Sequence, residues 1–192
     1  MHTHTEHVEL ICSIARSDAL LMNALLAARS LGLNAWCIGA GAVRNRVWDH
    51  LHHTGDGGPD ADVDLVYFDT DAQPSEDHAL QARLGKLLPD VSWDVTNQAH
   101  VHLWYEQSFG LAVRAVASLE EGISTWPEYA TCVGLTLDAS GTLDVIAPHG
   151  LKDLFALRLR HNPLRATRAA FLQRVASKRW LERWPDLRIC AP

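Results

Sequence analysis

The chain has 192 residues, of which 47% are hydrophobic and 21% are charged, and its formal net charge is −6. It is long and apolar enough for one compact domain, and the composition excludes a disordered or fibrous protein. The negative charge argues against broad binding to DNA, because neutralising phosphates requires a concentrated basic surface.

Neither the cysteines nor the apolar segments indicate an extracellular or membrane protein. The four cysteines are far apart and include no CxxC pair, so we expect neither a disulfide framework nor a zinc knuckle. The first residues are polar and histidine-rich rather than a leader sequence, and no apolar run is long enough to span a membrane. We therefore expect a cytoplasmic protein that does not bind membranes and whose N-terminus, with His2, His4 and His7, is frayed.

The first quarter of the chain predicts two helices separated by a strand. Leucine and alanine recur at helical spacing over Ser17–Leu31, where the first residue is a predicted N-cap. A short apolar strand is predicted over Ala35–Gly39, and the pattern becomes helical again from Ala42. A loop rich in turn-forming residues is predicted from His53 to Asp60.

The next segments predict two buried strands around a helix. Val63–Phe68 is apolar on both faces, as is typical of a central strand. Ser75–Leu88 has a helical pattern that ends before Pro89. Val91–Thr96 is predicted to be a second strand with one charge in an apolar setting.

The remaining elements complete the predicted fold. Ser118–Thr125 is predicted to be helical, and Thr131–Leu137 is predicted to pair with Leu143–Ile146 through a glycine-containing turn. From Gly150 the pattern is mostly helical. This order predicts an α/β or α+β fold with a central sheet covered by helices. We expect a single domain over residues 1–192, with a core at about 17–150 and a helical C-terminal part at about 150–192.

Three aspartates lie in or beside the predicted buried strands. Asp62 and Asp64 are two residues apart, so their side chains point to the same face of a strand. Asp94 interrupts the next apolar strand, where a carboxylate needs a partner. If these strands are neighbours, the three carboxylates favour a shared hard cation, Mg²⁺ or Mn²⁺. The alternative is a solvated loop edge, because this part of the chain is rich in aspartate.

A glycine turn precedes the second predicted helix. In Gly39-Ala40-Gly41, backbone N–H groups at the positive end of the helix can approach a phosphate. The turn is neither a GxGxxG fingerprint nor a P-loop, so a ligand-free tight turn is the alternative. Arg44 and Arg46 lie one turn further along, where either can reach a phosphate or be an ordinary exposed residue of the helix.

Two other groups of residues allow a functional and a structural interpretation. Asn97, Gln98 and His102 belong to a polar and aromatic segment that forms either a wall of an acceptor pocket or a helix cap and core packing. Positive charge gathers in the last third of the chain, which can hold an anionic substrate against the acidic first half or form a solvated helix face. The cationic residues concerned are Arg158, Arg160, Arg165, Arg168, Arg174, Lys178 and Arg179. The tryptophans predicted to serve in packing are Trp126, Trp180 and Trp184.

The combined pattern resembles the polymerase-β-like nucleotidyltransferase superfamily. It consists of a strand, Gly-x-Gly, a helix, hydrophobic-Asp-x-Asp and a later strand with a third aspartate. The stretch GAGAVRN (Gly39–Asn45) is similar to the glycine–arginine element of tRNA-nucleotidyltransferase and poly(A)-polymerase relatives. From about residue 36 to 189 the chain resembles a family of small bacterial nucleotidyltransferases of unassigned substrate. The matching segments are IGAGAVRNRVWDHLH, DVDLVYFD, WDVTNQAHVHLWY, TWPEYATCVGL, LDVIAPHGLKDLFALRLR and KRWLERWPDLRI.

This resemblance implies a polymerase-β-like fold with a mixed central sheet. It also implies Mg²⁺-dependent transfer of an NMP from an NTP such as ATP to a hydroxyl, by two-metal in-line displacement. Asp94 would both ligate a metal and help to deprotonate the acceptor hydroxyl. The implied residues are Gly39, Ala40, Gly41 and Arg44 for the nucleotide, and Asp62, Asp64 and Asp94 for metal binding and catalysis. The acceptor, whether a small molecule, a protein or an RNA, is not implied.

The chain departs from the superfamily pattern at two places. Ala40 stands where the usual Gly-Ser or Gly-Gly element would supply a serine or glycine, and a glycine-rich insert, Gly55 to Gly58, lengthens the segment before Asp62. These departures leave open a catalytically weak nucleotide- or metal-binding module on the same scaffold. A third hypothesis is a toxin-like transferase that modifies tRNA.

Overall fold

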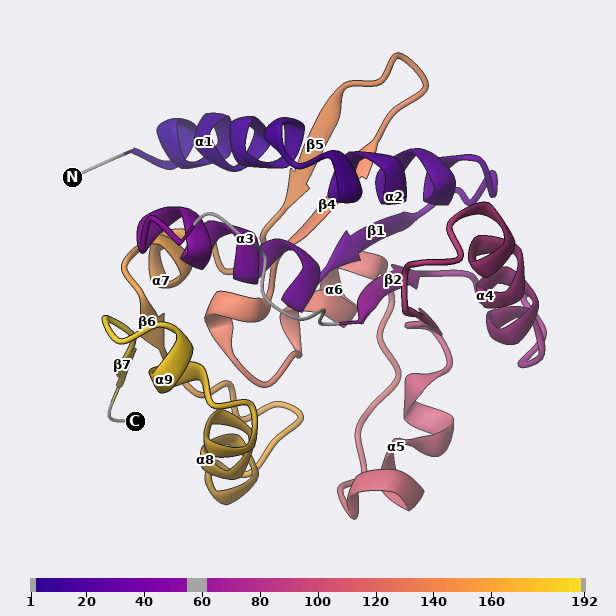
Figure 1. Cartoon of the computed structure of the whole chain (residues 1–192). Helices are drawn as coiled ribbons and strands as arrows, with labels where there is room; N and C mark the ends of the chain where they lie inside the picture. The colour runs from indigo at the N-terminus through magenta and orange to yellow at the C-terminus, as the bar shows by residue number, and fades with distance from the viewer. Residues whose placement is uncertain (1–2, 55–61, 191–192) are drawn as a thin grey trace.

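The centre of the molecule is a mixed five-stranded sheet with the strand order β3-β2-β1-β4-β5 (Figure 1). The structure is a computed structural model that describes residues 3–54 and 62–190. The strands are β1 (Trp36–Gly39), β2 (Val63–Tyr67), β3 (Trp93–Asn97), β4 (Gly134–Leu137) and β5 (Leu143–Ile146). β2 and β3 run parallel, whereas the other neighbouring pairs are antiparallel. The predicted strands are confirmed, and β2 lies inside the sheet as expected.

Helices surround this sheet, and most of them were predicted from the sequence, but α1 and α5 were not. The helical elements before β4 are α1 (His4–Ser17), α2 (Ala19–Arg29), α3 (Gly41–Leu51), α4 (Glu76–Leu87), α5 (Val101–Phe109), α6 (Leu119–Ser124) and the 3₁₀ turn η1 (Tyr129–Thr131). Those after β5 are α7 (Lys152–Phe155), α8 (Arg168–Ser177) and α9 (Trp180–Arg183). β4 begins later than its predicted strand because η1 occupies the first predicted residue.

The expectation of a frayed N-terminus is wrong for the described part of that segment. Thr3 and Glu6 form a capping box that starts α1, and the helix buries Ile11 and Ile14 in the core. Consequently Ser17, the predicted N-cap, is the last residue of α1. The cap of α2 is Asp18 instead, whose carboxylate accepts a hydrogen bond from a backbone N–H of the first turn at 2.8 Å. His2 lies outside the described residues.

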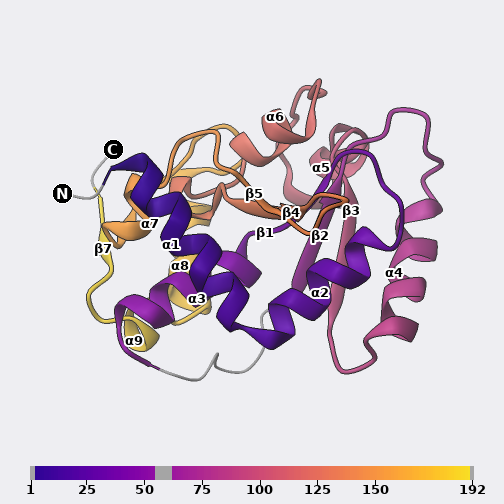
Figure 2. The same ribbon diagram turned by 90° about the horizontal axis from the view of Figure 1, so that it is seen from above.

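The two faces of the sheet are covered differently. Strand alternation sends Ile38 and Leu65 into the main core beneath α1, α2 and α3, whereas Val66 packs on the other face with Ile123 of α6. Figure 2 shows α1, α2 and α3 on one side of the sheet and α6 on the other. Residues of β2 whose side chains point to the same face of the sheet as Val66 therefore point away from the main core.

The C-terminal part contains the expected helices and a strand pair that was not predicted. The two-residue strands β6 (Arg158–Leu159) and β7 (Arg188–Ile189) pair in parallel. They are too short to leave a periodic pattern in the sequence. Trp180 and Trp184 are 3% and 1% exposed and pack edge-on against Trp48 of α3, with ring centroids 5.8 and 5.0 Å apart. Their predicted packing role is confirmed.

The loop before β2 can be described only in part. The predicted loop from His53 to Asp60 begins with a turn, and the glycine-rich insert, Gly55 to Gly58, lies outside the described residues.

Within residues 3–54 and 62–190, no single helix is long and apolar enough to cross a membrane. Taken together, α1 and α2 pass that test by length and composition, but they bend by 94° where they meet.

Candidate active site

The two carboxylates of adjacent strands lie side by side. In the parallel pair of β2 and β3, Asp64 is the direct partner of Asp94. Because Val63 and Leu65 point into the main core, Asp64 points to the opposite face. Asp62 precedes β2, and its carboxylate accepts a hydrogen bond from the hydroxyl of Ser92 at 2.6 Å. The expectation that the two aspartate-bearing strands are neighbours is therefore confirmed.

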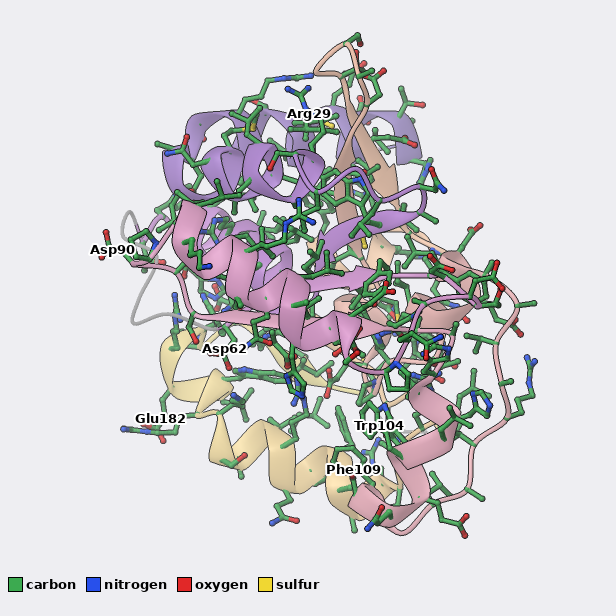
Figure 3. The ribbon with its side chains drawn as sticks, turned by 90° about the vertical axis from the view of Figure 1, so that its right-hand side faces the viewer. Arg29, Asp62, Asp90, Trp104, Phe109 and Glu182 are labelled. Carbon is green, nitrogen blue, oxygen red and sulfur yellow. The ribbon has the colours of Figure 1, made fainter. Side chains whose placement is uncertain are left out.

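The three aspartates line a cavity of about 330 Å³ whose walls carry opposite charges. The carboxylates and the first turn of α3 form one wall, and the segment from α8 to α9 forms the other. The described lining residues are Gly41, Arg44, Asn45, Asp62, Asp64, Asp94, Arg174, Lys178, Trp180, Arg183 and Trp184. In Figure 3, Asp62 lies above α8. Of the seven cations that the sequence analysis names in the last third of the chain, Arg174 and Lys178 line this cavity opposite the aspartates.

The surroundings of the acidic wall disfavour the ionised forms of Asp64 and Asp94. Burial, followed by the charge of Asp94, raises the pKa of Asp64 to about 7, although Arg44 and Arg174 act in the opposite direction. Burial and the charge of Asp62 also raise the pKa of Asp94. Carboxylates that repel one another in this way form a donor set that suits a hard divalent cation.

The carboxylates line the cavity without forming a closed ligand shell. Among the residues that the structure describes, no three His, Cys, Asp or Glu side chains are grouped closely enough to hold a metal ion. Mg²⁺ rarely needs such a shell, because it keeps several water ligands and binds through one or two carboxylates and substrate phosphates. The donor chemistry of Asp62, Asp64 and Asp94 therefore fits Mg²⁺ or Mn²⁺.

The glycine turn combines a packing role with an open helix end. A Cβ atom on Gly39 would stand 2.7 Å from Cη2 of Trp126 and 2.9 Å from the carbonyl oxygen of Val133, so only glycine fits there. Ala40 has φ 50° and ψ −124°, a conformation that favours glycine. Among the described residues, no side chain caps α3, which begins at Gly41. Because Gly41 lines the cavity, the first turn of α3 offers N–H groups beside it.

Arg44 is buried at the edge of this cavity, being 3% exposed. It donates hydrogen bonds of 2.8 Å to the hydroxyl of Thr131 and to the side-chain oxygen of Asn45. Its guanidinium carbon also lies 4.9 Å from the ring centroid of Trp48 and 4.3 Å from that of Trp180. Burial lowers the pKa of Arg44 to about 10, and its Nε has no hydrogen-bond partner among the described residues.

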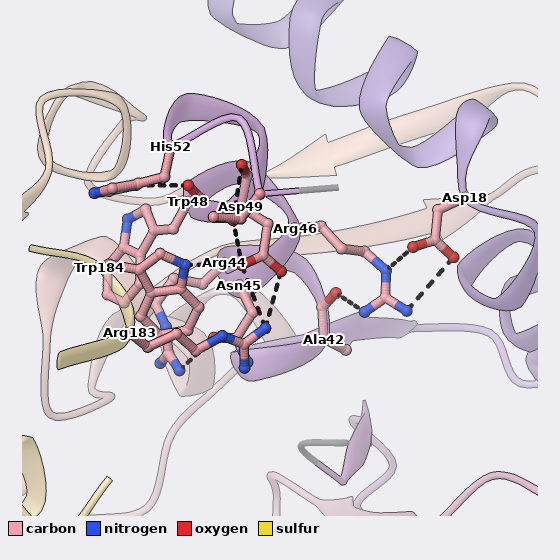
Figure 4. A network of polar contacts seen from close by, with 11 residues as sticks. Asp18, Ala42, Arg44, Asn45, Arg46, Trp48, Asp49, His52, Arg183 and Trp184 are labelled. Carbon is pink, nitrogen blue, oxygen red and sulfur yellow. Dashed lines mark hydrogen bonds and ion pairs between the residues drawn. The ribbon is translucent and has the colours of Figure 1, made fainter. Parts of the chain in front are cut away.

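The other arginine of this helix is turned away from the cavity. Arg46 forms an ion pair with Asp18 at 2.6 Å and donates a hydrogen bond to the carbonyl of Ala42 (Figure 4). Of the two arginines that the sequence offered as phosphate ligands, only Arg44 lines the cavity.

The sequence did not single out Glu128, which organises the basic side of the site. Its side chain is fully buried, accepts a hydrogen bond from the hydroxyl of Thr131 at 2.9 Å and pairs with Nε of Arg174 at 3.1 Å. Since Thr131 also binds Arg44, one carboxylate connects both guanidinium groups. A glutamate within the apolar stretch TWPEYATCVGL is the only signal that the sequence provides.

A smaller cavity of about 200 Å³ adjoins the first and shares Asp64 and Arg174 with it. Gln98 and Ala40 line this smaller cavity. Asn97, at the end of β3, instead uses its side chain to bind the segment that follows β2, where it donates a hydrogen bond of 2.6 Å to the carbonyl of Asp69.

The structure does not bring every candidate for the acceptor pocket to this site. Neither Asn97 nor His102 belongs to the described residues that line the two cavities. Gln98 alone among the three candidates does so.

The comparisons with known proteins agree with this architecture. A family model described as Nucleotidyltransferase matches residues 26–189, which is most of the chain. The chain belongs to this nucleotidyltransferase family. The nucleotidyltransferase is also similar to a solved NMR structure described as revealing a CCA-adding enzyme head domain. The two chains are 27% identical, the match covers 95% of each, and the TM-score is 0.78.

These findings confirm the family resemblance and the polymerase-β-like fold of the nucleotidyltransferase. Comparison with curated proteins gives no match. The family and the fold are therefore established, while the roles of individual residues depend on the geometry of the site.

Proposed function

We propose that this nucleotidyltransferase moves an NMP group from an NTP to a hydroxyl of an acceptor, by Mg²⁺- or Mn²⁺-dependent two-metal in-line displacement at the α-phosphorus. The observation that carries this proposal is the cavity of about 330 Å³ in which Asp62, Asp64 and Asp94 face Arg44 and Arg174. Metal–triphosphate complexes need this combination of acidic and basic walls.

The triphosphate would bind between the N-terminus of α3 and the basic wall. Backbone N–H groups from Gly41 onward and the guanidinium of Arg44 support the phosphates from one side. Gly39 and Ala40 form the turn that sets the direction of this helix. Arg174 and Lys178 from the C-terminal part supply further positive charge to the cavity.

Asp62, Asp64 and Asp94 would hold the metal ions. When bound, these ions supply positive charge that neutralises the leaving pyrophosphate and makes the acceptor hydroxyl easier to deprotonate. Without them, the carboxylates would repel the negatively charged NTP.

The chain's own groups position the reactants for a single displacement. The acceptor oxygen forms a bond to the α-phosphorus while the bond from that phosphorus to the bridging oxygen breaks, and pyrophosphate leaves. The proton of the acceptor hydroxyl passes to the carboxylate of Asp94, whose exposure to solvent allows the proton to be released to water. The cations on the basic wall stabilise the charge that develops on the phosphates.

A matched pair of aspartate variants tests the proposal. Pyrophosphate release is measured with Mg²⁺, each NTP and a panel of hydroxyl acceptors for the wild type, Asp64→Asn and Asp71→Asn. Asp71 is exposed and lies beyond the other end of β2. We expect Asp64→Asn to lose at least about 100-fold of the activity and Asp71→Asn to retain it. Retention of turnover by Asp64→Asn would overturn the proposal.

A binding module with little turnover is the second candidate function. It is favoured by Ala40, which supplies no hydroxyl at the turn and has a conformation that favours glycine. The same assay separates the two functions, since a binding module would take up Mg²⁺ and NTP without releasing pyrophosphate with any acceptor.

A further inference from the structure

A third cavity, of about 410 Å³, lies between α5 and α8. Its walls are mostly apolar and include the rings of Tyr105, Phe109 and Phe171. In Figure 3, Phe109 at the end of α5 lies beside α8, the helix that also passes below Asp62. This volume falls within the usual range of small-molecule sites, roughly 300–1,000 Å³.

One buried cation in this cavity has no anionic partner among the residues that the structure describes. Arg165 lines the cavity and is only 6% exposed. Its guanidinium lies 5.7 Å from the ring centroid of Tyr105, and it forms no hydrogen bond or ion pair with the side chains that the structure describes. Burial lowers the pKa of Arg165, which reflects the unfavourable environment of this charge. An unpaired buried charge is costly, so an anionic group from a ligand would complete the site.

This cavity is connected to the carboxylate site through shared side chains. Arg174 and Lys178 line both the cavity between α5 and α8 and the cavity that contains Asp64. Arg174 is held in place by its ion pair with the buried Glu128. A ligand between α5 and α8 therefore lies next to the place where phosphoryl chemistry would occur.

We propose that the cavity between α5 and α8 is the acceptor subsite, and that it takes a hydroxyl-bearing molecule with a planar ring and an oxyanion. The aromatic walls favour a planar ring, and the planar fork of Arg165 favours a phosphate or carboxylate. This assignment rests on the proposed nucleotidyl transfer, because it names the molecule that receives the NMP group.

Simple aromatic anions test the subsite without an acceptor being known. Phenyl phosphate and benzoate are titrated into the full-length protein in the absence of metal and NTP, with calorimetry as the readout. We expect phenyl phosphate, benzoate or both to bind at least about tenfold more tightly than inorganic phosphate or phenol. The comparison between phenyl phosphate and benzoate identifies the preferred oxyanion. Aromatic anions that bind no better than inorganic phosphate would overturn the proposal.

Charge variants locate the binding. Arg165→Met should weaken binding of the aromatic anion by at least about tenfold, whereas Arg83→Met, at an exposed position of α4, should leave it unchanged. If Arg165→Met does not fold, NMR of the wild type replaces it: the ring signals of Tyr105 and Phe109 should shift on titration. Unchanged affinity in Arg165→Met, or unshifted ring signals, would contradict the assignment.

Two cross-controls separate this subsite from the nucleotide site. Asp64→Asn should bind the aromatic anion normally, and Arg165→Met should bind Mg²⁺–NTP normally. If Arg165→Met loses anion binding but keeps full nucleotidyl transfer, the acceptor subsite alone would be refuted. Loss of Mg²⁺–NTP binding in a folded Arg165→Met variant would instead assign this cavity to the nucleotide and overturn the acceptor proposal.

Discussion

Asp64 has the least favourable electrostatic surroundings of the three aspartates that line the site. It lies opposite Asp94, and burial together with that neighbour raises its pKa to about 7. Without metal, the Asp64→Asn variant should therefore be more stable than the wild type at pH 8, by about 1–2 kcal/mol, because folding disfavours the ionised carboxylate.

Thermal unfolding in EDTA and in Mg²⁺ measures this effect. Mg²⁺ should raise the melting temperature of the wild type and leave that of Asp64→Asn nearly unchanged. A variant that is less stable in EDTA and still gains the full stabilisation from Mg²⁺ would show that Asp64 is a structural residue only.

Gly39 is required by close packing rather than by a flexible turn. A Cβ atom there would meet Trp126 at 2.7 Å and the backbone oxygen of Val133 at 2.9 Å. We expect Gly39→Ala to lower the free energy of unfolding by about 1–3 kcal/mol, as measured by urea denaturation. The control is Gly85→Ala in α4, where a Cβ would meet no atom within 4 Å; it should stabilise the protein by about 0.5–1 kcal/mol. Equal effects of the two substitutions would contradict this explanation.

At the scale of elements, long periodic segments were predictable and tertiary pairings were not. β2, α4 and β3 leave clear apolar patterns, and the aspartates within them were recognisable because a charge in an apolar strand is unusual. α1 was missed because its polar first turn hides a capping box. β6 and β7 have two residues each and leave no pattern.

The residues that line the carboxylate cavity were predictable to the same extent. Asp62, Asp64, Asp94 and Arg44 could be named in advance because each belongs to a local motif. Glu128 could not be named, because its role depends on Arg174, which is far away in sequence and reaches it only in the folded protein. The same reason explains why Arg165 stood out only as one of many cations.

The docking of α9 onto α3 depends on one buried carboxylate. Asp49 accepts hydrogen bonds from Arg183 at 3.0 Å and from the indole nitrogen of Trp184 at 2.8 Å (Figure 4). Asp49→Ala should lower the free energy of unfolding by about 2–3 kcal/mol, since it leaves the indole N–H buried without an acceptor. Urea denaturation measures the loss, and Glu182→Ala, on the exposed side of α9, should cost less than about 1 kcal/mol. A comparable cost for both variants would contradict the proposed role of Asp49.

At the scale of the whole molecule, we propose that the core and the C-terminal part unfold together. Trp48 of α3 packs against Trp180 and Trp184, so these parts share one buried cluster. Urea unfolding followed by tryptophan fluorescence and by far-UV circular dichroism should give coincident transitions. Separate midpoints would show that residues from about 150 onward form an independent unit.

Folding brings together side chains of opposite charge that are far apart in the sequence. The acidic strands and the basic helix α8 are distant in sequence, yet they form opposite walls of one cavity. A net charge of −6 therefore coexists with a local group of cations, Arg44, Arg174, Lys178 and Arg183, at one cavity. Under the proposed function, this arrangement would allow an acidic protein to bind a triphosphate when a cation joins the carboxylates to it.

Calorimetric titration of the four NTPs, with and without Mg²⁺, tests the central claim most directly when wild type and Asp64→Asn are compared. We expect at least one NTP to bind the wild type only in the presence of Mg²⁺ and to lose at least about tenfold in affinity in Asp64→Asn. Binding that needs neither Mg²⁺ nor Asp64, or no binding of any NTP, would contradict the claim that the carboxylate cavity is a metal–nucleotide site.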